Sequence, residues 1–235
     1  MHFYSPENIQ KLEAYLKVKS SPSNHEIQLL EKLMKYNEYF TKIPWVLGIA
    51  LCNSLAMNSA NEHSDIDLFV VTKSNRIWTV RIIMTLLLAI MWQRKTSKKH
   101  AGKFCLSFFI SQDWLDLTNI ALENDIYLAY WIDTLKPIIN RNNIFEDFIK
   151  SNSFLLGTNK EIEQKIIEQS LLKTSPLLKK CGDYIEKCMK FIFLARTKNS
   201  FQKLWKPFWV VISDTMLKFH NNDKRKDIRD IIISS

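Results

Sequence analysis

Two aspartates, Asp65 and Asp67, stand one residue apart at the start of an apolar run that continues to Val71. Side chains alternate faces along a β-strand, so both carboxylates would point to one side while Ile66 and Leu68 point into a core. Neighbouring carboxylates repel, and burial adds to the cost unless a cation lies between them. Mg²⁺, or Mn²⁺ in its place, prefers such oxygen ligands. We therefore predict a metal site at Asp65 and Asp67, of the kind that serves phosphoryl or nucleotidyl transfer.

The segment before these aspartates carries a second set of spaced residues. It reads Asn53-Ser54, then Ala56 and Asn58, then Ser64-Asp65-Ile66-Asp67-Leu68. Residues 45–111 resemble the DNA polymerase β-like nucleotidyltransferase superfamily, whose small stand-alone members often read Gly-Ser-x-Ala-x-Gly before Ser-Asp-x-Asp-Leu. The resemblance implies that Asp65 and Asp67 hold the catalytic metal and that a nucleoside triphosphate is the substrate. Asn53 and Ser54 would then contact the triphosphate, and Lys73, just beyond the strand, is a further candidate contact.

The sequence departs from that family pattern in two ways. Asn53 and Asn58 stand where glycine is usual, and asparagine tolerates left-handed backbone geometry but adds a side chain. Active members also carry a third carboxylate on a later strand, whereas residues 104–111, FCLSFFIS, contain none, and Ser107 is the expected occupant of that place. Acids further along, at positions 113, 116 and 123, are alternatives with no basis for a choice. An inactive nucleotidyltransferase-fold binding module, antitoxin-like or a partner of nucleic acid or protein, is the competing interpretation.

Several other residues suit phosphate chemistry or an ordinary structural role. His63 is either a phosphate or metal contact or a solvated loop residue, and Arg76 is either a triphosphate contact or a surface charge. Arg81, inside an apolar helix, calls for an anionic partner or faces the cleft. The basic turn at 94–103 would bind a nucleic-acid backbone through charge alone or remain a solvated loop. The aromatic and basic stretch at 201–209 favours core packing over base stacking.

The elements expected at the N-terminus are two helices. Ser-Pro-Glu at 5–7 is typical of a helix start. After a break at residues 20–24, Asn24 is expected to cap a second helix, with Ile27, Leu30 and Met34 on its inner face.

The expected sheet comes from three apolar runs, at residues 45–52, 66–72 and 104–111, with a long apolar helix through about Gln93. From Asp113 onward the pattern indicates helices almost throughout, including one over 125–138. These elements predict an α+β fold: a small mixed sheet flanked by helices, with a helical C-terminal region. We expect a nucleotidyltransferase-like core at 1–112 and a helical region at 113–235 packed on it.

The composition fits one or two ordinary globular cores. The chain has 235 residues, 46% of them hydrophobic, and a formal charge of +9, which suits phosphate-bearing partners including nucleic acid. Its N-terminus shows no apolar signal region, and the most apolar stretch, 82–92, is shorter than a membrane span. The four cysteines lack zinc-ligand spacing and are expected to be reduced, in a cytoplasmic protein.

Overall fold

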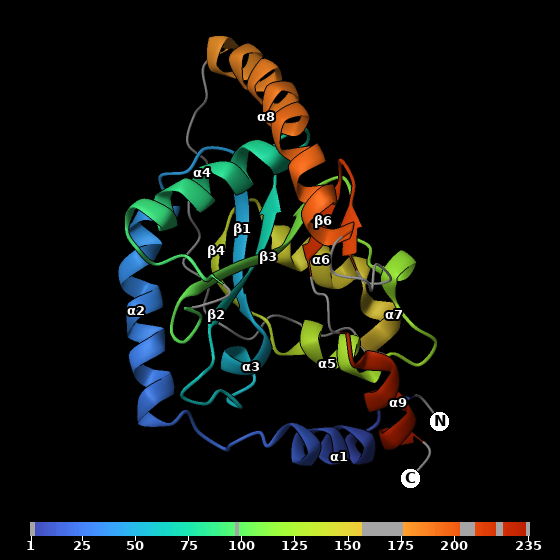
Figure 1. Cartoon of the computed structure of the whole chain (residues 1–235). Coiled ribbons are helices and arrows are strands. Elements are labelled where there is room, and N and C mark those ends of the chain that lie inside the picture. The colour runs from blue at the N-terminus through green and yellow to red at the C-terminus, as the bar shows by residue number, and fades with distance from the viewer. Residues whose placement is uncertain (1–2, 97–98, 157–175, 203–209, 220–222, 234–235) are drawn as a thin grey trace.

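The computed structural model describes residues 3–96, 99–156, 176–202, 210–219 and 223–233, and its centre is a six-stranded mixed sheet in the order β4-β1-β2-β3-β6-β5 (Figure 1). The strands are β1 (Val46–Cys52), β2 (Ile66–Thr72), β3 (Phe104–Ser111), β4 (Lys136–Asn140), β5 (Val210–Ile212) and β6 (Met216–Phe219). β1 runs antiparallel to β2 and β4, and β6 runs antiparallel to β3 and β5. Among these described strands only β2 and β3 pair in parallel, with a crossover helix between them.

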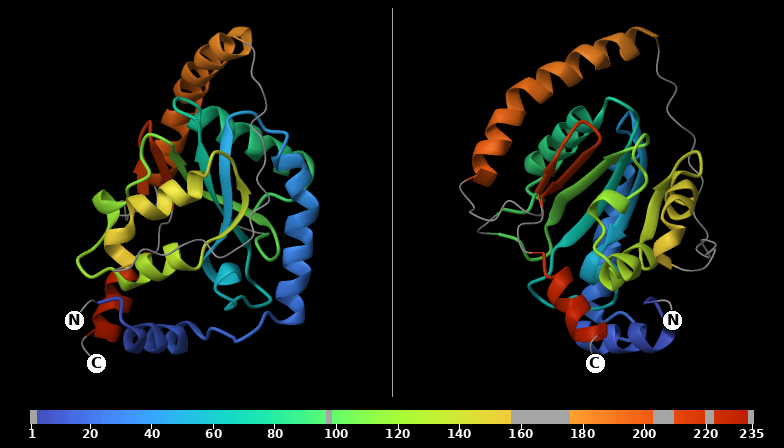
Figure 2. Two further views of the ribbon diagram at one scale, coloured as in Figure 1. Left: turned by 180° about the vertical axis from the view of Figure 1, so that it is seen from behind. Right: turned by 90° about the vertical axis from the view of Figure 1, so that its right-hand side faces the viewer.

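Helices cover both faces of this sheet, as the edge-on view in Figure 2 shows. The helices are α1 (Pro6–Leu16), α2 (Asn24–Phe40), α3 (Asn53–Ala56), α4 (Ile77–Ile90), α5 (Ile126–Asp133), α6 (Ile144–Ser151), α7 (Ser153–Leu156), α8 (Pro176–Gln202) and α9 (Arg225–Ile233), with a 3₁₀ turn at Thr118–Ile120. Helices α2, α4 and α8 pack on one face, and α1, α5, α6, α7 and α9 contribute to the core on the other. The expected α+β class with a mixed sheet is confirmed.

Strand β2 is buried along its whole length because both faces of the sheet are covered. Its Leu68 and Val70 belong to the core beneath α2 and α4, whereas Phe69 and Val71 belong to the core beneath α5 and α6. Asp67 lies on the same face as Phe69, at the end of the strand where the aromatic packing stops. The strand therefore presents its acidic end beside the α5 layer.

The N-terminal helices form where expected, with two differences in detail. Ser5 caps α1 by accepting a hydrogen bond from the Asn8 amide. The cap of α2 is Ser23 rather than Asn24, because Ser23 and Glu26 form a reciprocal capping box. The inner face of α2 was also predicted wrongly: Leu29 and Leu33 are buried, while Ile27 and Met34 are 43% and 53% exposed.

The prediction of helices almost throughout the second half is wrong for three segments. β4 pairs with β1 at one side of the sheet, and the β5–β6 hairpin extends the sheet beyond β3 at the other. The two parts of the chain thus contribute strands to the same sheet. Helix α5 and strand β4 are separated by only a few residues, so the apolar pattern does not show where the helix ends and the strand begins.

Helix α8 is fastened to the start of α4 by an acidic side chain. Glu186 of α8 accepts hydrogen bonds from the backbone amides of Trp78 (2.9 Å) and Thr79 (2.8 Å), which lack partners within their own helix. Next to it, Arg76 pairs with Asp183 of α8 at 2.6 Å. The end of the sheet remote from the aspartates is therefore a structural junction.

None of the described helices is both long enough and apolar enough to cross a membrane. The apolar stretch at 82–92 lies mainly within α4, which packs on the sheet. All four cysteines are free thiols.

Candidate functional site

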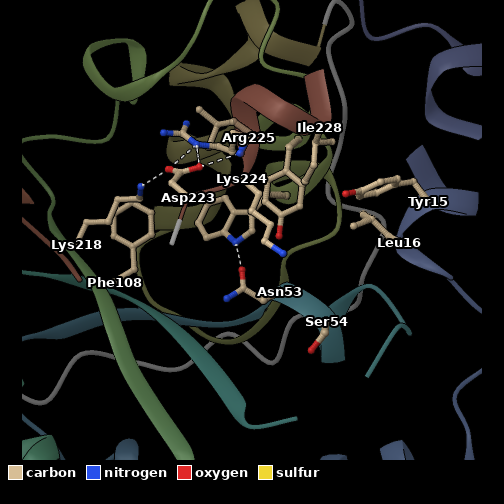
Figure 3. Close-up of a pocket in the computed structure, with 13 residues that line it drawn as sticks. Tyr15, Leu16, Asn53, Ser54, Phe108, Lys218, Asp223, Lys224, Arg225 and Ile228 are labelled. Atoms are coloured by element: carbon tan, nitrogen blue, oxygen red, sulfur yellow. Dashed lines mark hydrogen bonds and ion pairs between the residues drawn. The ribbon is translucent and has the colours of Figure 1, made fainter. Parts of the chain in front are cut away.

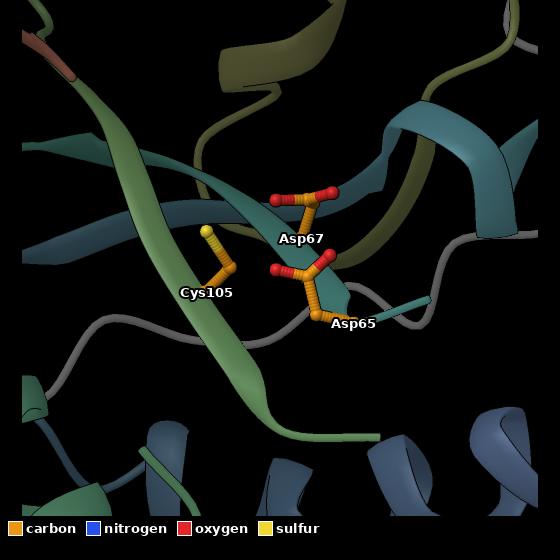
Figure 4. A group of neighbouring side chains, drawn as sticks. All are labelled: Asp65, Asp67 and Cys105. Atoms are coloured by element: carbon orange, nitrogen blue, oxygen red, sulfur yellow. The ribbon is translucent and has the colours of Figure 1, made fainter. Parts of the chain in front are cut away.

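Three side chains that can bind a metal meet at the starts of the parallel strands β2 and β3 (Figure 4). Asp67 lies directly opposite Cys105 in the β2–β3 register, and Asp65 precedes β2 on the same side. One potential ligand atom from each of the three residues lies within 4.8 Å of the others. The expectation that Ser107 occupies the place beside the aspartates is wrong, because the register brings Cys105 there.

A cation already neutralises part of this acidic cluster. The Lys95 ammonium forms an ion pair with Asp65 and donates a hydrogen bond of 3.7 Å to Sγ of Cys105. The side chains of Asn53 and Cys105 make hydrogen bonds to Asp67. The close approach of two aspartates on one strand is thus supported by the chain's own groups, including a lysine from the basic turn.

Burial and neighbouring charge shift the protonation of these groups. Burial, followed by the negative charge of Asp65, raises the pKa of Asp67, and the hydrogen bonds from Asn53 and Cys105 oppose that rise. Burial also raises the pKa of the Cys105 thiol, with the nearby carboxylates adding to the effect. Cys105 is therefore a neutral thiol at pH 7 that donates to Asp67, and it cannot serve as the base that a carboxylate in its place would supply.

Asn53 connects the acidic cluster to the neighbouring helix layer. Its φ of 58° is left-handed, a backbone geometry in which asparagine is one of the few suitable residues besides glycine. Its side-chain oxygen accepts a 2.9 Å hydrogen bond from the indole of Trp131 in α5. Its side chain also makes a hydrogen bond to Asp67. Asn58 is also left-handed, with φ of 54°, and accepts a hydrogen bond from Lys136. The two positions expected to favour glycine thus have the backbone geometry that glycine allows.

A cavity of about 430 Å³ opens beside Asn53 and Ser54. Figure 3 shows these two residues on one side of the cavity and Lys218, Asp223 and Arg225 on another. The remaining lining residues are Tyr15, Leu16, Phe108, Tyr127, Leu128, Trp131, Lys224 and Ile228. The cavity therefore combines an aromatic wall with several cationic groups, the composition expected of a small-molecule site with charged anchors.

A buried ion network fixes the cationic side of this cavity. Arg225, at the start of α9, pairs with Asp125 at 2.7 Å and with Asp223 at 2.9 Å, and Lys218 pairs with Asp223 at 3.2 Å. Asp125 also caps α5 through the amide of Leu128. Helix α9 is thereby held against α5.

Other predicted contacts lie away from the cluster. Lys73 follows the opposite end of β2, six residues from Asp67, or about 20 Å at the usual strand rise. The structure does not bring it to the site. Arg76 belongs to the α4–α8 junction and stacks on Trp45, and His63 is exposed in the loop before β2.

Arg81 has no acidic partner in the described part of the chain. It donates to the carbonyl of Leu106 at 2.8 Å and stacks on Phe219.

The later acids do not complete the cluster. Asp113 accepts hydrogen bonds from Ser74 and Ser111 at the far end of β3, and Asp116 accepts from Thr118. Glu123 is exposed and is absent from the cluster of candidate ligands. Much of the aromatic and basic stretch, residues 203–209, lies outside the described residues.

Sequence reasoning missed the two residues that complete the cluster. Cys105 looked like a small hydrophobic residue within a strand, and Lys95 looked like one charge among several in a basic turn. The available signal for Cys105 was its position in a predicted strand, but choosing it over Ser107 required the pairing register with Asp67. Arg225 gave no local signal, because its contact with Asp125 joins residues 100 positions apart. Lys218 pairs with Asp223 nearby in the sequence, but its place in the cavity depends on the pairing of β6 with β3.

No protein-family model, curated protein or solved structure matches this chain.

Proposed function

We propose that this chain is a divalent-cation-dependent nucleotidyltransferase, which transfers a nucleotidyl group from a nucleoside triphosphate to an acceptor. The observation that carries this proposal is the cluster of Asp65, Asp67 and Cys105, next to a cavity bordered by Asn53 and Ser54. The resemblance of residues 45–111 to the DNA polymerase β-like nucleotidyltransferases supports it. So do the left-handed conformations at 53 and 58, where members of that superfamily often carry glycine.

The donor set is compatible with Mg²⁺ or Mn²⁺. Asp65 and Asp67 offer carboxylate oxygens, which both ions favour, and Cys105 adds a softer and neutral third group. Such an ion, when bound, would offset negative charge that develops on the oxygens around the reacting phosphorus. The carboxylates would hold it, and Lys95 would reduce their mutual repulsion or compete for Asp65.

The cavity offers complementary contacts for the nucleotide. The hydroxyl of Ser54 is suited to a phosphate oxygen, and the exposed Lys224 adds a positive charge from the start of α9. Trp131 and Tyr127 provide aromatic surface of the type on which nucleobases stack. In this arrangement the nucleobase lies toward α5 and the phosphate groups of the nucleotide lie toward β2.

The same contacts favour a second candidate, a catalytically inert binding module. Lys95 pairs with one carboxylate and a neutral thiol stands beside the other, so the cluster is partly neutralised and is hydrogen-bonded without an added ion. A module of this kind would retain the fold and the cavity while lacking turnover.

Calorimetry with each nucleoside triphosphate, in the presence of Mn²⁺ or Mg²⁺, distinguishes the two candidates. The transferase predicts binding that requires the divalent ion, and turnover detectable as pyrophosphate release when acceptors are screened. The Asp65→Asn and Asp67→Asn double variant should abolish turnover and leave the fold intact. Silence toward every triphosphate would favour the inert module, and a double variant as active as wild type would place the reaction elsewhere.

A further inference from the structure

A second cavity, of about 350 Å³, lies at the edge of β3. Strand β6 pairs with β3 only from Phe108 to Ile110, and the basic turn pairs with Phe104 at the start of β3. Among the described strands, none pairs with residues 105–107 on this side. The lining residues are Arg81, Thr85, Arg94, Lys95, Thr96, Phe104, Cys105, Leu106, Ser107 and Phe219. They come from α4, the basic turn, β3 and the end of β6.

The lining of this cavity is strongly cationic. Arg81, Arg94 and Lys95 contribute three positive charges, of which that of Lys95 is paired with Asp65. None of the lining residues that the structure describes is acidic. Arg81 and Arg94 line the same cavity, and burial, followed by the charge of Arg94, lowers the pKa of Arg81 to about 10. An anion in the cavity would relieve this repulsion.

Arg81 is held in a fixed orientation for such an anion. Its Nη1 donates to the Leu106 carbonyl at 2.8 Å, and its guanidinium carbon lies 3.9 Å from the centre of the Phe219 ring. No other hydrogen bond of its guanidinium to the described residues is seen. A guanidinium held in this way matches the planar, bidentate geometry of phosphate recognition.

The cavity adjoins the acidic cluster. Lys95 and Cys105 line the cavity and also contact or belong to the cluster of Asp65 and Asp67. An anion bound among the cations would thus lie next to the proposed site of transfer. Among the described residues, no carboxylate lines this cavity to remove a proton from a hydroxyl acceptor.

We propose that this basic cavity binds the phosphate group of the acceptor, and that the acceptor is a phosphate monoester. This inference rests on the proposed transferase function. An oxygen of the acceptor phosphate would form a bond to the α-phosphorus of the triphosphate. The bond from that phosphorus to the bridging oxygen of the β-phosphate would break, and pyrophosphate would leave with the electron pair. The product carries a diphosphate linkage, and because the attacking oxygen is already ionised, no base is needed.

Binding of inorganic phosphate, measured by calorimetry at low salt, tests the cavity directly. We expect Arg94→Gln to weaken phosphate binding about tenfold, the loss typical of one charge-assisted hydrogen bond. Lys99→Gln removes the same charge from an exposed residue of the same turn that does not line the cavity, and it should change binding less than about twofold. Arg81→Gln should match Arg94→Gln, once circular dichroism shows a wild-type fold.

The source of the phosphate is tested with a short oligonucleotide carrying a 5′-phosphate, its 5′-hydroxyl counterpart and a nucleoside monophosphate. Tighter binding of either phosphorylated probe, lost in Arg94→Gln, supports the cavity and identifies the class of acceptor. The proposal would be overturned if the two oligonucleotides bound equally and Arg94→Gln and Lys99→Gln weakened their binding equally. That result would indicate nonspecific contact with the oligonucleotide backbone. The Asp65→Asn and Asp67→Asn double variant should still bind phosphate, so failure of the transferase proposal and failure of this cavity give different results.

Discussion

The ammonium group of Lys95 is ion-paired with the carboxylate of Asp65 at the start of β2. Lys95 comes from the turn after α4, and the same ammonium donates to Cys105 on β3. It therefore supplies, from within the chain, the positive charge that two neighbouring aspartates require. A divalent ion at the same carboxylates must either share Asp65 with this lysine or displace it.

Replacing Lys95 with glutamine should tighten Mn²⁺ binding about tenfold, because the variant removes a competing positive charge within contact distance of the ligands. Electron paramagnetic resonance titration of free Mn²⁺ measures the affinity. Lys99→Gln is the matched control, since it removes a charge from the same turn without touching the aspartates. An unchanged affinity in Lys95→Gln would show that the ion binds away from Asp65.

Cys105→Asp should convert the cluster into three carboxylates, raise the affinity for Mg²⁺ about tenfold and reduce the preference for thiophilic metals. Without metal the added charge should destabilise the fold by about 1–3 kcal/mol, because three acids would then share a mostly buried site. Thermal unfolding in chelator and in excess Mg²⁺ measures both effects. Cys105→Ala is the control and should show no gain with Mg²⁺. Equal stability of Cys105→Asp with and without Mg²⁺ would count against a metal site.

Glu186→Ala should lower the free energy of unfolding by about 2 kcal/mol, because it leaves the amides of Trp78 and Thr79 without a partner and removes a negative charge from the start of α4. Urea denaturation measures the loss. Asp183→Asn is the matched control on the same helix, since its side chain is 56% exposed and its pair with Arg76 should contribute less than about 1 kcal/mol. If both variants lost the same free energy of unfolding, the hydrogen bonds that Glu186 accepts would contribute no more than an exposed ion pair.

The three strands that carry the site were predictable because they are continuous apolar runs. Expected at 45–52, 66–72 and 104–111, they are found at Val46–Cys52, Ile66–Thr72 and Phe104–Ser111. Strands β4 and β6 were not predictable. β4 follows α5 with little polar interruption, and β6 is four residues long and is defined by its pairing with β3.

Within the site, local backbone geometry was more accessible to sequence reasoning than contacts between distant elements. Asparagine at 53 suggested tolerance of a left-handed residue, and its φ is 58°. In the described residues, six of the nine non-glycine residues with left-handed φ are asparagines. Because the whole chain has only four glycines, asparagine takes over much of the role of glycine in its turns. Lys95 and Cys105 depended instead on the register of β2 and β3, which no local pattern fixes.

Glu26 ties helix α2 to the loop that precedes β2. Its carboxylate pairs with Lys19 at 2.6 Å and accepts hydrogen bonds from the amides of Ser23 (2.7 Å) and Ala60 (2.8 Å). Burial raises the pKa of Glu26, but the contacts with Lys19, Ser23 and Ala60 outweigh it and lower the pKa to about 2. The loop between Asn58 and Asp65 is therefore anchored by an ionised and buried carboxylate.

This lowered pKa makes Glu26 a source of acid sensitivity. The stabilisation is complete above the ordinary pKa of 4.5 and is lost as the pH falls toward about 2, because the folded state must then bind a proton that it resists. Glu26→Gln should be less stable than wild type at pH 7 by on the order of 3 kcal/mol, and the difference should narrow steadily below pH 4.5. Urea denaturation at a series of pH values measures the difference. Glu31→Gln, an exposed change on the same helix, should follow wild type at every pH. If the gap between Glu26→Gln and wild type stayed constant from pH 7 to pH 3, the ionised carboxylate would not be what holds the loop.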